Sequence, residues 1–160
     1  SSFLDFIITP LAAFLVLSPS RGLHLVLFAI IAWSLAEYVI HRFVFHRFAM
    51  IEPLHNIHHA TTKRWVGVSS WGTSLGFFAA WLVAAAVMDA YYADAFTAGT
   101  IIGYLAYCCI HLHYHHGNPE SFGRYVSFMA RHHAIHHRGV RANYGVSTPV
   151  WDFLFNTYRG

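Results

Sequence analysis

Histidine is the residue type whose placement says most about the chemistry of this chain. The sequence has 14 histidines among 160 residues, and all but one fall into four short groups. The groups read H-R-F-V-F-H at 41–46, H-N-I-H-H at 55–59, H-L-H-Y-H-H at 111–116 and H-H-A-I-H-H at 132–137. Neutral imidazole is a common ligand for zinc, copper, iron and nickel. Because the groups are internal and spaced apart, they are not an expression tag, and they predict a metal site.

The spacing within the groups predicts which imidazoles face the same way. The pattern H-x-x-H-H occurs at 55–59 and again at 133–137. Positions i, i+3 and i+4 share one face of a helix, so each copy predicts a patch of three imidazoles. His41 and His46 are five residues apart, which is about 140° around an ideal helix. They converge only at a frayed helix end, at a π-bulge or around two metals.

These patterns together predict ten metal ligands, enough for two metal ions with about five nitrogens each. The predicted ligands are His41, His46, His55, His58, His59, His111, His115, His133, His136 and His137. Three neighbours are expected beside the ligands, as surrounding or spare residues: His113, His116 and His132. His24 stands alone in an apolar run and is excluded.

The ligand types indicate which metal chemistry to expect. A structural zinc site is closed and takes four ligands, so ten histidines are too many for one such site. A hydrolytic two-metal centre usually includes carboxylates, and none of the seven acidic residues lies inside a histidine group. Nitrogen-rich ligation suits a redox metal with open positions for O2, although it does not exclude zinc. Glu37 lies one helical turn before His41, so it is a candidate acceptor for a ligand N–H or else an acid at a helix end.

Composition places the histidines in a membrane protein. The chain is 56% hydrophobic and 11% charged, whereas about 25% of residues are charged in a typical soluble domain. Apolar runs of about 17–25 residues fit a membrane-spanning helix. The expected fold is a single all-α domain over residues 1–160, an integral membrane bundle of about four transmembrane helices with a His-rich helical cap. The four runs are Phe3–Leu17, which is short and contains Pro10, then Gly22–Val39, Val68–Met88 and Ala95–Ile110, with 89–94 as a tight helical hairpin.

Charge sets the expected orientation. Nine of the ten Lys and Arg residues lie in the His-bearing segments or the C-terminal region, and only Arg21 does not. The positive-inside rule therefore places the histidines on the cytoplasmic face. The net charge of +3 and the absence of a basic stripe argue against nucleic acid as a partner. Cys108 and Cys109 are adjacent in an apolar run and are expected to be reduced, packed thiols.

The four ordered histidine motifs resemble the fatty acid hydroxylase/sterol desaturase superfamily over about residues 33–158. The runs E-Y-V-I-H-R-F-V-F-H at 37–46 and L-H-N-I-H-H at 54–59 are most similar to its fatty acid 2-hydroxylase branch, and the C-terminal stretch 133–158 resembles the superfamily's ending. The resemblance implies a helical membrane oxygenase with a cytoplasmic di-iron centre, in which the ten histidines above are the ligands. It also implies that O2 and reducing equivalents oxidise a lipid C–H bond. Zinc is expected to replace iron in purified protein, because both metals accept imidazole.

The chain also departs from fused members of that superfamily. It contains no H-P-G-G motif of a cytochrome b5-type haem domain, so the electron donor is expected to be a separate protein, cytochrome b5-like or ferredoxin-like. The leading interpretation is an O2-dependent lipid or fatty acid hydroxylase. The alternatives are a desaturase or methyl oxidase of a sterol-like or carotenoid lipid, and a non-catalytic metal-binding subunit of a membrane complex.

Other residues have two interpretations each. Five aromatic residues would line an acyl-chain cavity or, more simply, pack the membrane helices: Trp33, Trp65, Trp71, Phe77 and Phe78. Three basic residues would bind a lipid headgroup or anchor the chain at the interface: Lys63, Arg64 and Arg141. The stretch 144–158 is expected to lie along the interface or to cap the site.

Overall fold

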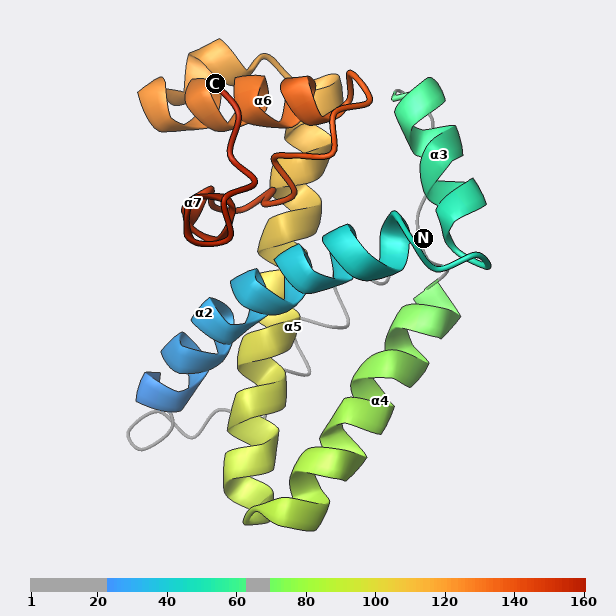
Figure 1. Ribbon diagram of the computed structural model, residues 1–160. Coiled ribbons are helices and arrows are strands. Elements are labelled where there is room, and N and C mark those ends of the chain that lie inside the picture. The colour runs from blue at the N-terminus through green and yellow to red at the C-terminus, as the bar shows by residue number, and fades with distance from the viewer. Residues whose placement is uncertain (1–22, 63–69) are drawn as a thin grey trace. The chain divides into compact units, whose positions relative to one another are not determined.

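The computed structural model describes residues 23–62 and 70–160, and these residues form helices and connecting segments without a strand (Figure 1). The expectation of an all-α fold is therefore confirmed for the described part of the chain. The chain divides into two compact units. The described part of the first, the apolar unit, comprises residues 23–33 and 70–105; that of the second, the histidine unit, comprises 34–62 and 106–160.

Three long helices carry the apolar runs: α2 (Leu23–Val39), α4 (Ser70–Val87) and α5 (Ala90–His116). Two helical stretches, His24–Phe45 and Ala90–His116, are long and apolar enough to cross a membrane, and Trp71–Val87 is apolar but shorter. Of the four expected spans, the described residues therefore supply two of full length. The first expected run, Phe3–Leu17, lies outside the described residues.

The connection between α4 and α5 is tighter than the sequence suggested. The predicted hairpin at 89–94 is mostly helical, because α4 ends at Val87 and α5 already begins at Ala90. Asp89 explains the early start: its carboxylate accepts a hydrogen bond from the backbone N–H of Tyr91 at 2.9 Å. A carboxylate in this position satisfies an N–H that the first turn of a helix leaves unpaired.

Small residues bring α2 and α5 close together within the apolar unit. Gly99 and Gly103 lie four residues apart on α5. A Cβ atom at Gly99 would lie 2.6 Å from the Cβ of Ala29, and one at Gly103 would lie 2.7 Å from the Cβ of Trp33. Glycines at this spacing allow close helix contact in membrane proteins, where van der Waals packing replaces the hydrophobic effect between helices.

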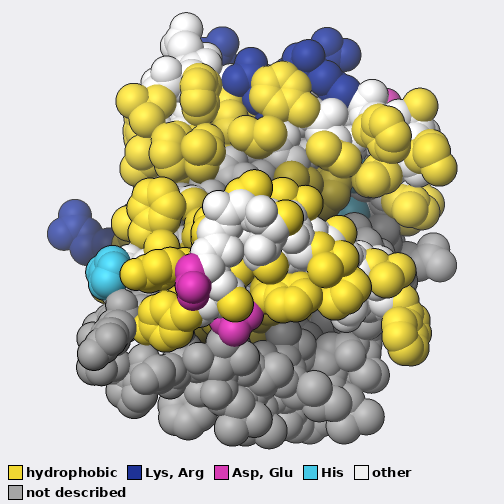
Figure 2. All heavy atoms as spheres, turned by 90° about the horizontal axis from the view of Figure 1, so that it is seen from below, with side chains coloured by type: hydrophobic (Ala, Val, Ile, Leu, Met, Phe, Trp, Pro, Cys, Tyr) yellow, Lys and Arg dark blue, Asp and Glu magenta, His cyan; other side chains and the backbone are white. Residues whose placement is uncertain are grey.

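Side chains on the outside of the apolar unit are themselves apolar, as hydrophobic colouring dominates the face in Figure 2. Trp71 is 82% exposed and Val87 is 75% exposed. Such a surface is unfavourable in water and suited to lipid. Cys108 and Cys109 form no disulfide, as expected, but Cys109 is exposed rather than packed.

The aromatic residues that were considered for a cavity lie in different environments. The Trp33 ring packs against Phe77 at 6.0 Å and Tyr104 at 5.4 Å between centroids. Phe78 is exposed and stacks on Trp81. These contacts correspond to helix packing. Trp65, Lys63 and Arg64 lie outside the described residues, and Arg141 is exposed.

The histidine unit is built from short elements around the end of α5. It contains η1 (Ile40–Phe45), α3 (Glu52–Ala60), η2 (Pro119–Phe122), α6 (Arg124–His136) and α7 (Val150–Leu154). A Pro in the first turn starts α3, where its missing N–H costs no hydrogen bond. The segments after α6 return to pack around buried Asn143 and Asp152, so this C-terminal region forms the core of the unit.

Candidate metal centre

The ten histidines singled out by the sequence come together in the histidine unit as two groups of five. We call them the first and second histidine groups. In each group the candidate ligand atoms all lie within 4.8 Å of one another. The first group is His41, His46, His55, His59 and His136, and the second is His58, His111, His115, His133 and His137.

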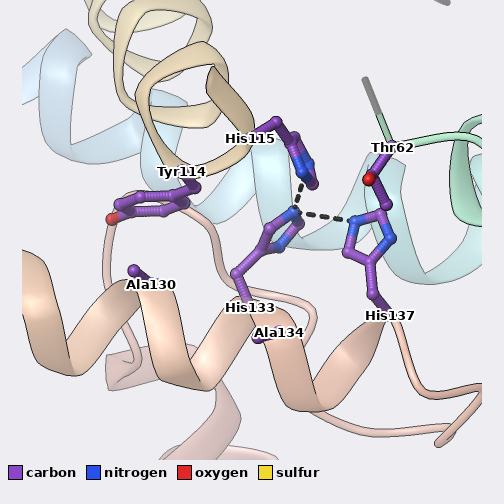
Figure 3. Close-up of a pocket in the computed structure, with 7 residues that line it drawn as sticks. All are labelled: Thr62, Tyr114, His115, Ala130, His133, Ala134 and His137. Carbon is purple, nitrogen blue, oxygen red and sulfur yellow. Dashed lines mark hydrogen bonds between the residues drawn. The ribbon is translucent and has the colours of Figure 1, made fainter. Parts of the chain in front are cut away.

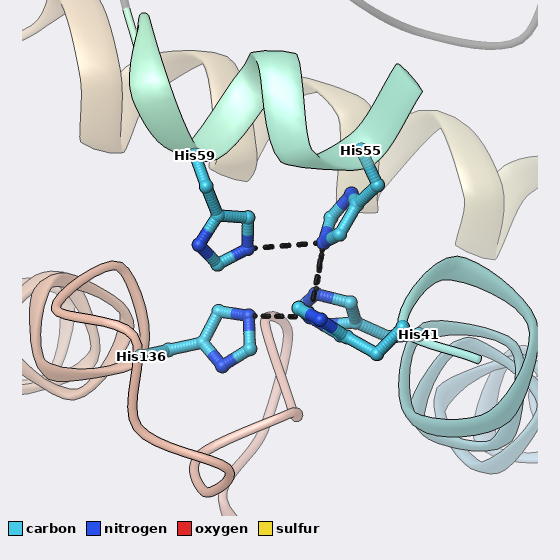
Figure 4. A group of neighbouring side chains, drawn as sticks. His41, His55, His59 and His136 are labelled. Atoms are coloured by element: carbon cyan, nitrogen blue, oxygen red, sulfur yellow. Dashed lines mark hydrogen bonds between the residues drawn. The ribbon is translucent and has the colours of Figure 1, made fainter. Parts of the chain in front are cut away.

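In the first group, rings from η1, α3 and α6 point their Nε2 atoms at a common centre (Figure 4). The Nε2 atom of His55 lies 3.1 Å from the Nε2 atoms of His41, His46 and His59. His136 approaches His46 in the same way, at 3.0 Å. A single small volume therefore receives one nitrogen from each of five residues.

A π-helix brings His41 and His46 together. Residues Ile40–Phe45 form a π-helix that continues directly from α2. The π-helix bonds i to i+5, so residues five apart approach the same face, which they do not in an α-helix. The π-helix is one of the three arrangements that the spacing of these two histidines allowed. Both rings belong to the first histidine group.

The two H-x-x-H-H patches are each divided between the groups. On α3, His55 and His59 belong to the first group and His58 to the second. At the end of α6, His136 belongs to the first group, whereas the adjacent His137 belongs to the second. The sequence predicted the patches but left this partition open, because it depends on how α3 and α6 face each other.

The second group combines rings from the end of α5 with rings from α3 and from the end of α6. The Nε2 atom of His111 lies 3.1 Å from those of His58 and His115, and that of His133 lies 3.1 Å from His115 and 2.9 Å from His137. Three of these rings also line a cavity of about 200 Å³ (Figure 3). The residues lining the cavity are Thr62, Tyr114, His115, Ala130, His133, Ala134 and His137.

Both groups have dimensions that suit a metal ion. Metal–imidazole bonds are about 2.0–2.1 Å long, so nitrogens on opposite sides of one ion lie about 4.2 Å apart. The observed limit of 4.8 Å within each group is close to this value. No carboxylate among the described residues belongs to either group, so the donor set is all nitrogen.

The imidazoles are held in the neutral form that metal binding requires. Burial, together with neighbouring imidazoles, lowers the pKa of His58 and of His59 from the usual 6.5 to about 4. Burial lowers the pKa of His136 to about 3 and that of His137 to about 2. At neutral pH these rings therefore keep a lone pair on one nitrogen, which could bind a metal.

Backbone carbonyls fix which nitrogen of two first-group rings carries the proton. The Nδ1–H of His41 donates to the Tyr144 carbonyl at 2.6 Å, and the Nδ1–H of His136 donates to the Ala142 carbonyl at 2.8 Å. Since a carbonyl only accepts, both rings carry their proton on Nδ1 and present the Nε2 lone pair to the centre. Both carbonyls belong to residues 142–147, which we call the strap.

Glu37 also contacts the strap. It is buried, and its carboxylate accepts hydrogen bonds from the backbone N–H of Val146 at 2.6 Å, from that of Ser147 at 2.9 Å and from the Ser147 hydroxyl. The sequence suggested that Glu37 would accept a hydrogen bond from a ligand ring. In the structure its carboxylate instead contacts the strap, and the strap accepts the hydrogen bond from His41 of the first histidine group.

The other predicted neighbours lie apart from the two centres. The Nε2–H of His132 donates to buried Asp152 at 3.1 Å. His113 packs against Phe122, and His116 is exposed at the end of α5. His24, which the sequence excluded, is exposed near the start of α2.

Sequence reasoning placed Asp152 and Tyr144 in the stretch 144–158, expected at the interface or over the site, but gave neither residue a role of its own. Asp152 is fully buried, and the Tyr144 ring packs against His41, His46 and His136 at 5.4–5.9 Å between centroids. One signal for Asp152 was present in the sequence: it is the sole charged residue within the apolar run V-W-D-F-L at 150–154. An acid in such a run is expected to be buried with partners.

A helical protein with membrane-length helices and ten clustered histidines defines a narrow class. Residues 26–157 match the fatty acid hydroxylase family, and the chain belongs to this family. The chain is 30% identical to a fatty acid 2-hydroxylase of Rattus norvegicus, over 89% of this chain and 41% of that protein. It is 27% identical to a dihydroceramide fatty acyl 2-hydroxylase of Arabidopsis thaliana, over 89% of this chain and 63% of that protein.

A solved structure shares the fold. The chain superposes on full-length scs7p, of which only the hydroxylase domain is visible, with a TM-score of 0.75 and 23% identity. The match covers 96% of this chain and 63% of that one. The chain thus spans between two fifths and two thirds of the proteins described here.

Proposed function

We propose that this chain is the catalytic domain of a membrane-bound lipid hydroxylase, which uses O2 to convert a C–H bond of an acyl chain to C–OH. The observation that carries the proposal is the pair of all-nitrogen groups, five histidines each, in a chain of the fatty acid hydroxylase family. The substrate class is supported by relatives named as fatty acid and dihydroceramide fatty acyl 2-hydroxylases.

The ten histidines would hold two iron ions, which supply the activation of O2 and the oxidation of the C–H bond. Imidazole also accepts zinc, so zinc can replace iron in purified protein. Inserting one oxygen atom of O2 into a C–H bond consumes two electrons and two protons and releases one water. We therefore include a separate electron donor, cytochrome b5-like or ferredoxin-like, among the proposed partners.

The protein's own groups perform three tasks in this proposal. The lowered pKa values of rings such as His58 and His59 keep their lone pairs free for a metal at neutral pH. The strap holds the rings of His41 and His136 in one tautomer. The cavity beside His133 and His137 gives small molecules a route to the second group.

We further propose a topology of four membrane spans with the histidine unit on the cytoplasmic side. The distribution of Lys and Arg supports it, since nine of ten lie in the His-bearing or C-terminal segments. Single cysteines at the exposed positions Ala90 and Arg138, in a chain whose native Cys108 and Cys109 are replaced by Ser, should be labelled from opposite sides of sealed vesicles. Labelling of both from one side would contradict this topology.

Lipid analysis tests the proposed reaction. Cells that make the wild-type chain together with an electron donor should gain a lipid species heavier by one oxygen atom. His136→Ala and His58→Ala, which remove one ligand from each histidine group, should abolish this product. His24→Ala is the matched control, because His24 is exposed and belongs to neither group.

Other outcomes would identify the alternatives. A lipid that has lost two hydrogens would indicate a desaturase. An unchanged lipid profile, from a chain shown to be inserted and to contain both metals, would contradict the hydroxylase proposal and favour a metal-binding subunit.

A further inference from the structure

Asp152 lies at the centre of a hydrogen-bond network beneath the strap. It is fully buried. Its Oδ1 accepts from the backbone N–H of Tyr144 at 2.8 Å, and its Oδ2 accepts from that of Gly145 at 2.8 Å. A Cβ atom at Gly145 would lie 2.9 Å from Oδ2, so only glycine allows this approach. A buried carboxylate that accepts several hydrogen bonds strongly restricts the groups that donate to it.

Side chains fill the remaining acceptor positions of Asp152. The Thr157 hydroxyl donates to Oδ1 at 2.7 Å, and the His132 ring donates to Oδ2 at 3.1 Å. Because Thr157 gives its proton to Asp152, it accepts from the Tyr38 hydroxyl at 2.9 Å, which in turn accepts from Arg42 at 2.7 Å. The network thus joins α2 and η1 to α6 and α7.

Asn143 fixes the strap from the other side. It is fully buried and has a left-handed backbone with φ of 58°, a conformation that Asn tolerates better than most residues. Its side-chain amide donates to the carbonyls of His132 and Arg159, and its side-chain oxygen accepts from the Arg159 N–H at 2.7 Å. These bonds leave the strap carbonyls with fixed directions.

The second histidine group has no equivalent support within the described residues. The Nδ1 atoms of His133 and His137 are buried and have no hydrogen-bond partner among the described residues. In the first group, by contrast, the Nδ1 atoms of His41 and His136 donate to strap carbonyls. The hydrogen bonds that the Nδ1 atoms of the rings make therefore differ between the two groups.

We propose that Asp152 is a positioning residue for the first metal alone: through the strap it holds the rings of His41 and His136 and makes the first site the more tightly binding of the two. The proposal rests on the two-metal function proposed above. Loss of hydrogen-bonding partners behind a metal ligand costs about 10- to 100-fold in metal affinity. We expect that loss to fall on one group and to leave the other unchanged.

Zinc release from purified protein tests the proposal without measuring turnover. Full-length protein in detergent is loaded with zinc, and its release to an excess of chelator is followed. Wild type should release one zinc fast, from the second group, and one slowly. Asp152→Asn places an amide where the carboxylate accepted from Gly145 and His132, and it should accelerate the slow release by about 10- to 100-fold.

Two double variants, each with one histidine group disabled, show from which group zinc is released. His58→Ala/His137→Ala disables the second group, and His55→Ala/His59→Ala disables the first. Asp152→Asn should accelerate release in the former and have no effect in the latter. Cobalt(II) absorption should show the same pattern, with a changed spectrum only where the first group is intact. Glu120→Gln, which neutralises an exposed acid, should change neither release nor spectrum.

A milder pair of variants covers the case in which Asp152→Asn fails to fold. Thr157→Val removes the hydroxyl that links Asp152 to Tyr38, and Thr157→Ser restores it. Faster release from the first group in the Val variant, with wild-type release in the Ser variant, supports the proposal. Equal acceleration at both groups, or at neither, would overturn it. A wild-type chain that binds fewer than two zinc ions would instead overturn the two-metal function, and this inference with it.

Discussion

The two histidine groups each contain five histidines and no other residue type, yet their surroundings differ. The first group lies under the strap, where carbonyls and the Tyr144 ring contact its imidazoles. The second group lies beside a cavity, and two of its rings have an unpartnered Nδ1 within the described part of the chain. Equal ligand sets can therefore form unequal metal sites, because the second layer fixes the orientation and basicity of the first.

The two adjacent histidines at the end of α6 belong to different groups, so substituting each one tests one group by itself. We expect the largest loss of activity from these substitutions. His136 belongs to the first group and His137 to the second. Each single change to Ala should remove one of two metals and reduce turnover by at least about 100-fold, since loss of a ligand costs more than loss of its supporting hydrogen bond. Metal analysis with single-turnover assays measures both. If either variant retained both metals, the assignment of that histidine as a ligand would be wrong.

A substitution that fills the cavity should weaken ligand binding at the second group only. We expect this effect to be smaller than that of losing a histidine. Ala134 lines the cavity, and Ala134→Leu would occupy part of the space beside His133 and His137 (Figure 3). Binding of azide to the loaded protein should weaken by about tenfold, which corresponds to about 1.4 kcal/mol. The metal content should stay the same. Ala80→Leu, the same change at an exposed position of α4, is the control. Unchanged azide binding in Ala134→Leu would exclude the cavity as the route to the second group.

Low pH should destabilise the two groups to a similar degree, so we expect it to give the smallest difference between them. Burial lowers the pKa of His58 in the second group and of His59 in the first to about 4. In metal-free protein the unfolded chain then binds more protons than the folded chain between pH of about 6.5 and 4, so the free energy of unfolding falls as pH falls through this range. The still lower pKa values of His136 and His137 extend the fall below pH 4. The two variants that each disable one group should show the same trend in thermal unfolding. A loss of stability confined to one of them would show that the groups differ in protonation as well.

The sequence could predict which histidines share a helix face, because helical spacing is a local property. Positions 55, 58 and 59 must share a helix face wherever α3 lies, and the ordered motifs predicted the family and the all-helical fold. The π-helix at Ile40–Phe45 was one of three arrangements that the spacing of His41 and His46 allowed. Only the packed structure selects among them, because a π-helix is stable only where tertiary contacts compensate for its poor local geometry.

The supporting layer could not be predicted, because its contacts are distant in sequence and follow no period. Glu37 contacts Val146 and Ser147 across more than a hundred residues. Asp152 contacts His132 on a different helix and Tyr144 in an irregular segment. Such contacts depend on how a loop without periodicity folds back, which neither hydrophobic pattern nor helix propensity specifies. The same holds for the partition of each H-x-x-H-H patch between two groups.

That partition has a geometric consequence. On α3 the neighbours His58 and His59 serve different groups, and at the end of α6 so do His136 and His137. Adjacent residues on a helix are separated by a fixed rise of about 1.5 Å and a turn of about 100°. The two helices α3 and α6 thus help to fix the spacing between the two histidine groups. Insertions outside the helices that carry these histidines can therefore lengthen the chain without changing the spacing between the two groups.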